Sequence, residues 1–104
     1  MREEQLWKID VKDDGEVLII SPSGEVDLST SPKLVAAFDH SANGHRDLIC
    51  DITNITFIDS TGMRALLELA SGEPDRFALS GSSAAVEQLL DLCCVADRFR
   101  RVDR

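Results

Sequence analysis

The sequence predicts an α/β fold, with a mixed β-sheet of four to five strands and α-helices packed on it. Short apolar segments of strand length alternate with longer segments whose apolar residues recur every three or four positions. Such alternation implies parallel strands joined by right-handed crossovers. The chain has 104 residues, of which 43% are hydrophobic. This length suits a single domain over residues 1–104 with one hydrophobic core.

The chain is expected to begin with a β-hairpin, because two strand-like segments flank the turn sequence KDDG. Two later segments, DLICDI and RFALSG, are short and largely apolar, as central strands are. Strands are therefore expected at 6–11, 16–21, 47–52 and 76–81, with extended chain at 24–26 and a short last strand within 98–102.

Three helices are expected from capping residues and apolar spacing. The first begins in the cluster STSP (29–32), where hydroxyl caps precede a proline, and runs to about Ala42. The second runs from about Ser60 to Ala70, with apolar residues at helical spacing. The third is SSAAVEQLLDLCCV (82–95), which begins with serine caps.

The three cysteines are Cys50, Cys93 and Cys94. Cys93 and Cys94 continue the apolar stripe of the third helix, which predicts that both are packed as small hydrophobic side chains. A redox role is the alternative, and it would more readily use Cys50 or another chain, because adjacent cysteines bridge only with strain. The cysteines and the two histidines lack zinc-ligand spacing, so neither a metal nor a cofactor is expected.

The formal net charge of −8 argues against nucleic-acid binding, which needs clustered Lys and Arg. It favours a partner with a basic surface, although acidity also serves solubility. The first ten residues show no signal peptide, and no apolar run is long enough to span a membrane. A cytoplasmic protein without membrane contact is expected.

The stretch FIDSTGMR (57–64) raises the main functional question. Asp59 or Ser60 can simply cap the second helix by accepting hydrogen bonds from its first amides. A single cap does not need three polar residues followed by Gly62, and a glycine in the first turn costs roughly 1 kcal/mol relative to alanine. The glycine therefore suggests close approach of another chain or a ligand at an edge where strands end and helices begin.

Ser60 is not expected to be a catalytic nucleophile, so we do not expect an enzyme. A nucleophilic serine needs a base within hydrogen-bond reach. His40 and His45 lie at the far end of the first helix, at the opposite edge of the sheet, and a ten-residue helix is roughly 15 Å long. The sequence also has no G-x-S-x-G motif. Both histidines are expected to be solvated.

The segment SGEVDLSTS is expected to end at the same edge of the sheet as Ser60. A loop and a helix cap do not account for Glu25 and Asp27 on an otherwise extended segment. An exposed serine at a helix N-terminus is a suitable acceptor for a phosphoryl group delivered by a kinase. Phosphate adds about −1.5 to −2 charge, which beside Asp59 and Asp27 would repel an acidic or apolar partner surface.

These residues resemble a known family. The segment SGEVDLSTSPKL, followed by LICDITNITFIDSTGMRALL, is similar to the STAS domain of bacterial anti-sigma factor antagonists. The resemblance covers nearly the whole chain. Its specific part is DSTG, which follows an apolar strand and a loop and precedes an amphipathic helix, while GEVD supports it more weakly. The chain departs at Met63, where many relatives have leucine, and in the short connection at 71–75.

The resemblance implies a partner and a switch. Such an antagonist binds an anti-sigma factor that is also a serine kinase of the GHKL type, and this binding releases a sigma factor. The kinase phosphorylates the serine after the motif aspartate, here Ser60, which abolishes binding, and a serine phosphatase reverses the modification. The implied partner-binding residues are Asp27, Ser29, Thr30, Asp59, Ser60, Thr61, Gly62, Met63 and Arg64. The alternative is a STAS subunit docked on a transporter ATPase or another STAS-type signalling scaffold.

Overall fold

The computed structural model describes residues 7–104. Leu6, the first residue of the expected first strand, lies outside the described residues. So does most of the N-terminal segment in which no signal peptide was expected. The elements, in chain order, are β1 (Lys8–Asp13), β2 (Val17–Val26), α1 (Ser31–Ser41), β3 (Asp47–Asp51), β4 (Ile55–Ile58), α2 (Ser60–Gly72), β5 (Phe77–Ser80), α3 (Ala84–Leu92), the 3-10 turn η1 (Ala96–Arg98) and β6 (Arg101–Val102).

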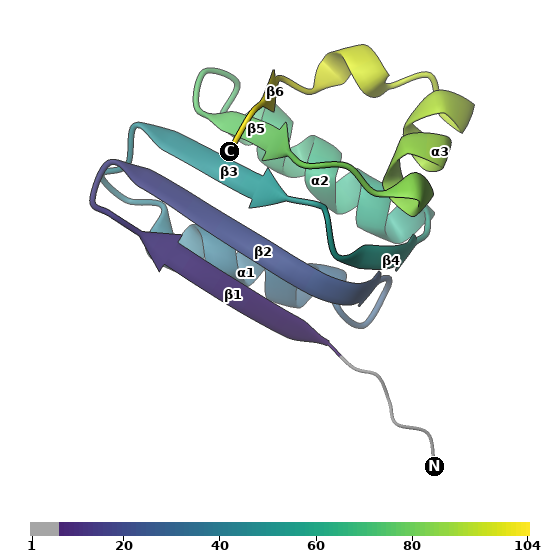
Figure 1. Ribbon diagram of the computed structural model, residues 1–104, viewed down its shortest axis with the longest axis horizontal. Coiled ribbons are helices and arrows are strands. Elements are labelled where there is room, and N and C mark those ends of the chain that lie inside the picture. Colours follow the sequence, from purple (N-terminus) through teal and green to yellow (C-terminus); the bar gives the residue numbers. More distant parts are fainter. Residues whose placement is uncertain (1–6) are drawn as a thin grey trace.

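The strands form one mixed sheet in the order β1-β2-β3-β5-β6, with β4 paired to β2 (Figure 1). β1 and β2 are the expected antiparallel hairpin, and every other strand pair is parallel. The predicted α/β class is confirmed. The described residues form six strands instead of four to five, and β6 is the short last strand.

β4 is the strand that the sequence did not predict, because Ile55–Ile58 has only four residues and two of them are exposed. It pairs with the second half of β2, whose first half pairs with β3. A register irregularity between Gly24 and Glu25 interrupts the pairing of β2 with β4. The expected extended chain at 24–26 is thus the end of β2.

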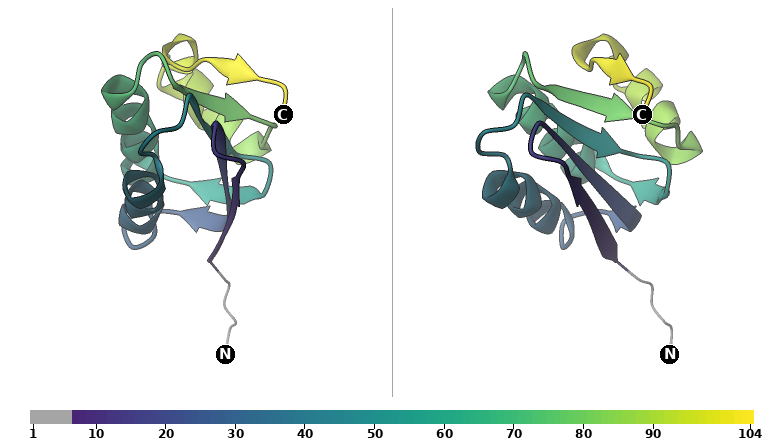
Figure 2. Two further views of the ribbon diagram at one scale, coloured as in Figure 1. Left: turned by 90° about the vertical axis from the view of Figure 1, so that its left-hand side faces the viewer. Right: turned by 60° about the vertical axis from the view of Figure 1, so that its left-hand side comes forward.

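Helices α1 and α2 cover one face of the sheet (Figure 2). The main core lies between them and the sheet, and it includes Leu34 and Phe38 of α1 and Leu66 of α2. Phe38 meets Phe77 of β5 edge to face, with 5.5 Å between ring centroids. Val86 and Leu90 of α3 extend the same core, and α3 packs against β4. This packing therefore places the N-termini of the helices at one end of the sheet.

The prediction that Cys93 and Cys94 are packed is wrong, because both are exposed. Helix α3 ends at Leu92, and Cys94 has φ 57°, so the chain leaves the helix before the apolar stripe reaches the cysteines. Cys50 of β3 is the buried cysteine, and desolvation, with a smaller effect of Asp51, raises the pKa of its thiol to about 12. A buried thiol of this kind is a poor nucleophile.

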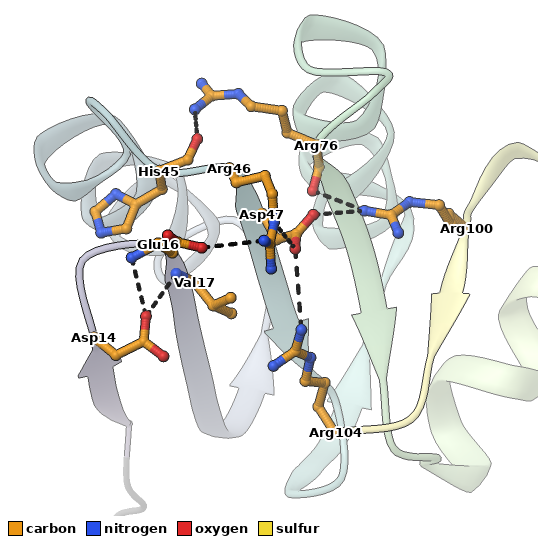
Figure 3. Close-up of polar contacts among 9 residues, drawn as sticks. All are labelled: Asp14, Glu16, Val17, His45, Arg46, Asp47, Arg76, Arg100 and Arg104. Atoms are coloured by element: carbon orange, nitrogen blue, oxygen red, sulfur yellow. Dashed lines mark hydrogen bonds and ion pairs between the residues drawn. The ribbon is translucent and has the colours of Figure 1, made fainter.

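The prediction that both histidines are solvated is wrong for His45, although His40 is exposed. The ring of His45 is buried in the loop before β3, and its Nε2 lies 2.7 Å from Oδ1 of Asp13 at the hairpin. Figure 3 shows the polar network at this end of the sheet, where Asp47 meets Arg46 and Arg100. These contacts join the hairpin, β3 and the C-terminal segment, so a structural role accounts for them.

Candidate functional site

The candidate site is built where β2 and β4 end side by side. Val26 and Ile58 are paired in parallel register, so the next residues, Asp27 and Asp59, leave the sheet at the same edge. The Asp59 N–H donates to the Val26 carbonyl oxygen at 3.3 Å. The pairing of β4 with β2 therefore brings together the two segments that the sequence singled out.

Asp27 organises a tight polar turn before α1. Its Oδ1 accepts hydrogen bonds from the N–H and Oγ of Ser29, both at 3.0 Å, and from the N–H and Oγ1 of Thr30, both at 3.1 Å. Oγ1 of Thr30 also donates to the Glu25 carbonyl oxygen at 2.6 Å. Burial opposes ionisation of Asp27, but these hydrogen bonds, led by the Ser29 hydroxyl, lower the pKa of its carboxyl below the usual range. The turn is thus rigid and negatively charged.

Asp59 caps α2, as the interpretation of DSTG as a simple helix cap predicts. Its Oδ1 accepts the Gly62 N–H at 2.9 Å, and its carbonyl oxygen accepts the Met63 N–H at 2.9 Å. Ser60 is the first residue of α2 and is exposed. Because Asp59 supplies the cap, the hydroxyl of Ser60 is left at the surface beside the positive end of the helix dipole.

Gly62 is required by a contact inside the chain, which corrects the expectation of another chain or a ligand. A Cβ built on Gly62 would collide with the Val26 carbonyl oxygen and would lie 2.8 Å from Cγ1 of Ile58 and 2.9 Å from Cγ1 of Val26. The first turn of α2 therefore sits directly on the ends of β2 and β4. This close approach fixes the position of Ser60 relative to Asp27.

Two residues expected on the partner surface are buried. The Met63 side chain is 2% exposed and belongs to the main core, and Thr30 is also buried within the turn at Asp27. Their buried side chains support the exposed residues of the site. Ser29, Ser60 and Arg64 are exposed at the same edge.

The sequence reasoning missed exposed apolar residues around the site. Leu28, at the tip of the turn between Asp27 and Ser29, is 74% exposed, and Phe57, two residues before Asp59, is 47% exposed. Large exposed apolar side chains beside charged residues are typical of protein-binding surfaces. A leucine within an otherwise polar turn sequence was the available signal for Leu28.

A groove of about 360 Å³ continues the site between α1 and α2. Thr61 and Arg64, both predicted as site residues, line its α2 side, and Pro32, Val35 and Asp39 line its α1 side. The α1 residues could not be assigned from sequence because only the packing of the two helices places them beside Thr61.

No catalytic arrangement accompanies Ser60 in the part of the chain that the structure describes. His45 lies at the opposite end of the sheet, bound to Asp13. Across residues 7–104, no group of three or more His, Cys, Asp or Glu side chains is arranged to hold a metal ion. None of the helices described is both long and apolar enough to cross a membrane.

The fold and this site define a small α/β domain with an exposed serine at the start of α2. The chain belongs to the STAS domain family, whose model matches residues 8–103. No curated protein sequence matches the chain.

Solved structures share the fold. An anti-sigma factor antagonist from Mycobacterium paratuberculosis is similar, with a TM-score of 0.81 and 24% identity over 95% of this chain and 87% of that one. The Bacillus cell fate determinant SpoIIAA in its phosphorylated form has a TM-score of 0.64 and 14% identity, over 95% and 93% of the two chains. A sulfate transporter family protein from Wolinella succinogenes has a TM-score of 0.64 and 21% identity, over 84% and 77%.

Proposed function

We propose that this protein is a cytoplasmic anti-sigma factor antagonist whose binding is switched off by phosphorylation of Ser60. It binds an anti-sigma factor that is a serine kinase of the GHKL type, and so releases a sigma factor. A serine phosphatase restores the active form. The observation that carries the proposal is the exposed Ser60 at the first position of α2, with its cap supplied by Asp59 and the Asp27 turn beside it.

The partner surface of this proposal combines apolar contact with negative charge. Leu28 and Phe57 provide apolar area, and Asp27 and Asp59 provide carboxylates next to it. Such a surface fits a partner patch with apolar pockets and a basic rim. The net charge of −8 favours approach to a basic surface.

Phosphorylation acts on this surface by charge and bulk while the domain keeps its fold. The phosphate sits at the N-terminus of α2, where the helix dipole favours an anion by roughly 0.3–1 kcal/mol. A partner group packed on Ser60 instead meets a dianion next to Asp59. A hundredfold loss of affinity needs only about 2.7 kcal/mol, which one unpaired buried phosphate readily supplies.

The test begins with capture of the kinase from the native cytoplasm by the wild-type protein. Incubation with that kinase and ATP, followed by intact mass and phosphopeptide mapping, should place one phosphate on Ser60. Ser60→Ala should take no phosphate and bind constitutively, and Ser60→Asp should bind weakly with an unchanged melting temperature. Thr61→Ala is the matched control and should still be phosphorylated. Phosphate on Thr61, or tight binding by Ser60→Asp, would contradict the proposal.

The second candidate is a STAS subunit docked on a transporter ATPase or another signalling scaffold. The similarity to the sulfate transporter family protein favours it. The capture experiment separates the two, because a transporter ATPase in place of a kinase among the bound proteins would support this candidate.

A further inference from the structure

β1 forms one border of the sheet, and its outer edge is unpaired. It bonds to β2 on one side only, and no other strand within residues 7–104 lies next to it (Figure 1). A six-residue edge strand presents a row of backbone N–H and C=O groups that can pair with another strand. The question is which strand fits it.

The hydrogen-bond pattern shows which groups of β1 face outward. The Asp14 N–H donates to the Val17 carbonyl oxygen at 3.3 Å, which makes this the first bonded pair of the hairpin. Bonded and non-bonded pairs alternate along an antiparallel ladder. The pair Ile9↔Pro22 is therefore non-bonded, as the missing N–H of proline requires. The N–H and C=O groups of Ile9, Val11 and Asp13 consequently point away from β2.

The side chains of β1 form two distinct rows. Val11 is 47% exposed on the face that the helices cover, where Ile9 packs against the main core. On the opposite face, Lys8, Asp10 and Lys12 alternate in charge and are all exposed. None of these three makes an ion pair with another residue of the described range. Within residues 7–104, these charges have no partner that a second strand would have to displace.

Charge and strand length together select one register for two copies of this strand. In antiparallel pairing, directly opposed side chains lie on the same face of the sheet. A two-fold axis normal to the sheet must therefore pass through a residue, which then pairs with its own copy. An axis at Ile9 opposes Lys8 to Asp10 but pairs only three of the six residues of β1, whereas an axis at Val11 pairs five of them. An axis at Asp10 sets that residue against itself and Lys8 against Lys12. An axis at Lys12 again opposes like charges. An axis at Val11 sets Asp10 against Lys12 twice and Lys8 against Asp14 twice.

We propose that the chain forms a homodimer through antiparallel pairing of β1 with β1 of a second copy, centred on Val11. In this register Val11 bonds to Val11, and Ile9 bonds to Asp13, through the N–H and C=O groups that already face outward. Asp10 and Lys12 occupy the non-bonded pairs, where opposed side chains come closest. Charged edge residues usually oppose pairing; here they exclude the neighbouring registers and favour this one.

The proposed dimer interface runs along the outer side of β1, whereas Ser60 lies at the end of the sheet where β2 and β4 finish. β1 contributes no residue to the candidate site. The inference therefore stands independently of the proposed function.

The test is the association of the full chain, measured by sedimentation velocity over a range of protein concentrations. The wild type should dimerise, more weakly at high salt because the pairs are exposed. Lys12→Glu opposes like charges at both symmetric positions and should weaken the dimer about tenfold or more. The double variant Asp10→Lys/Lys12→Glu restores opposite charges and should recover the dimer. Lys33→Glu on α1 is the matched control with the same charge change and should have no effect.

A second variant tests the backbone pairing. Val11→Pro removes an N–H that makes no bond within the sheet, so the fold should persist by circular dichroism while the dimer is lost. A wild type that stays monomeric at every concentration overturns the inference. An unchanged dimer in Lys12→Glu, or a double variant no tighter than Lys12→Glu, overturns the register.

Discussion

Replacing Gly62 with alanine should destabilise the domain, although alanine is the better helix former. The added Cβ would meet the Val26 carbonyl oxygen and Cγ1 atoms of Val26 and Ile58 at 2.9 and 2.8 Å. The carbonyl cannot turn away easily, because it accepts the Asp59 N–H and belongs to the β2–β4 pair. Helix α2 must therefore shift away from the sheet.

The magnitude follows from two opposed effects. Overpacking of a tight contact costs typically about 1–3 kcal/mol, and a contact with backbone favours the upper part of that range. The gain in helix propensity offsets about 1 kcal/mol. The net loss in the free energy of unfolding is thus about 2 kcal/mol, which for a domain of this size lowers the melting temperature by about 8–16 °C.

Thermal and urea unfolding, followed by circular dichroism, measure this loss. Gly72→Ala is the matched control, because Gly72 ends the same helix and a Cβ there would meet nothing within 4 Å. This control should be neutral or stabilised by up to about 1 kcal/mol. If Gly62→Ala is as stable as Gly72→Ala, the close approach of α2 to Val26 is not the reason for glycine at this position.

Three further variants test other parts of the structure. The hydrogen bond that His45 donates to the Asp13 carboxylate raises the pKa of His45 despite the burial of its ring. The pair therefore stabilises the fold below the unfolded pKa of histidine and loses this contribution as pH rises through the raised value. His45→Gln should therefore flatten the decline of unfolding free energy between about pH 6 and pH 8. Cys94→Gly should stabilise the chain by up to about 1 kcal/mol, because φ is 57° at this exposed residue, and a lower urea midpoint would contradict this. Arg64 lies one helical turn after Ser60, where its side chain can reach back to a phosphate. Phosphorylation of Ser60 should raise the melting temperature more in the wild type than in Arg64→Ala, and equal shifts would exclude that pair.

Sequence patterns that act over a few residues predicted much of the fold. The turn KDDG defined the β1–β2 hairpin, and Asp59 identified the start of α2 because a cap and its amides lie within one turn of each other. Apolar runs located β3 and β5 as buried strands. Ser60 could be singled out in the same way, because its exposure follows from its place at the helix start.

Other features depend on contacts between residues far apart in sequence. β4 is too short and too exposed to be recognised by itself, and it is a strand because the second half of β2 pairs with it. That pairing places Asp27 beside Asp59 and makes glycine necessary at position 62. The packing of α2 on the sheet buries Met63, to which the resemblance assigned a partner-binding role although its apolar helical spacing placed it on the core side. Local hydrogen bonding and periodicity determined which residues form each element, whereas long-range pairing and packing decided which side chains reach the surface.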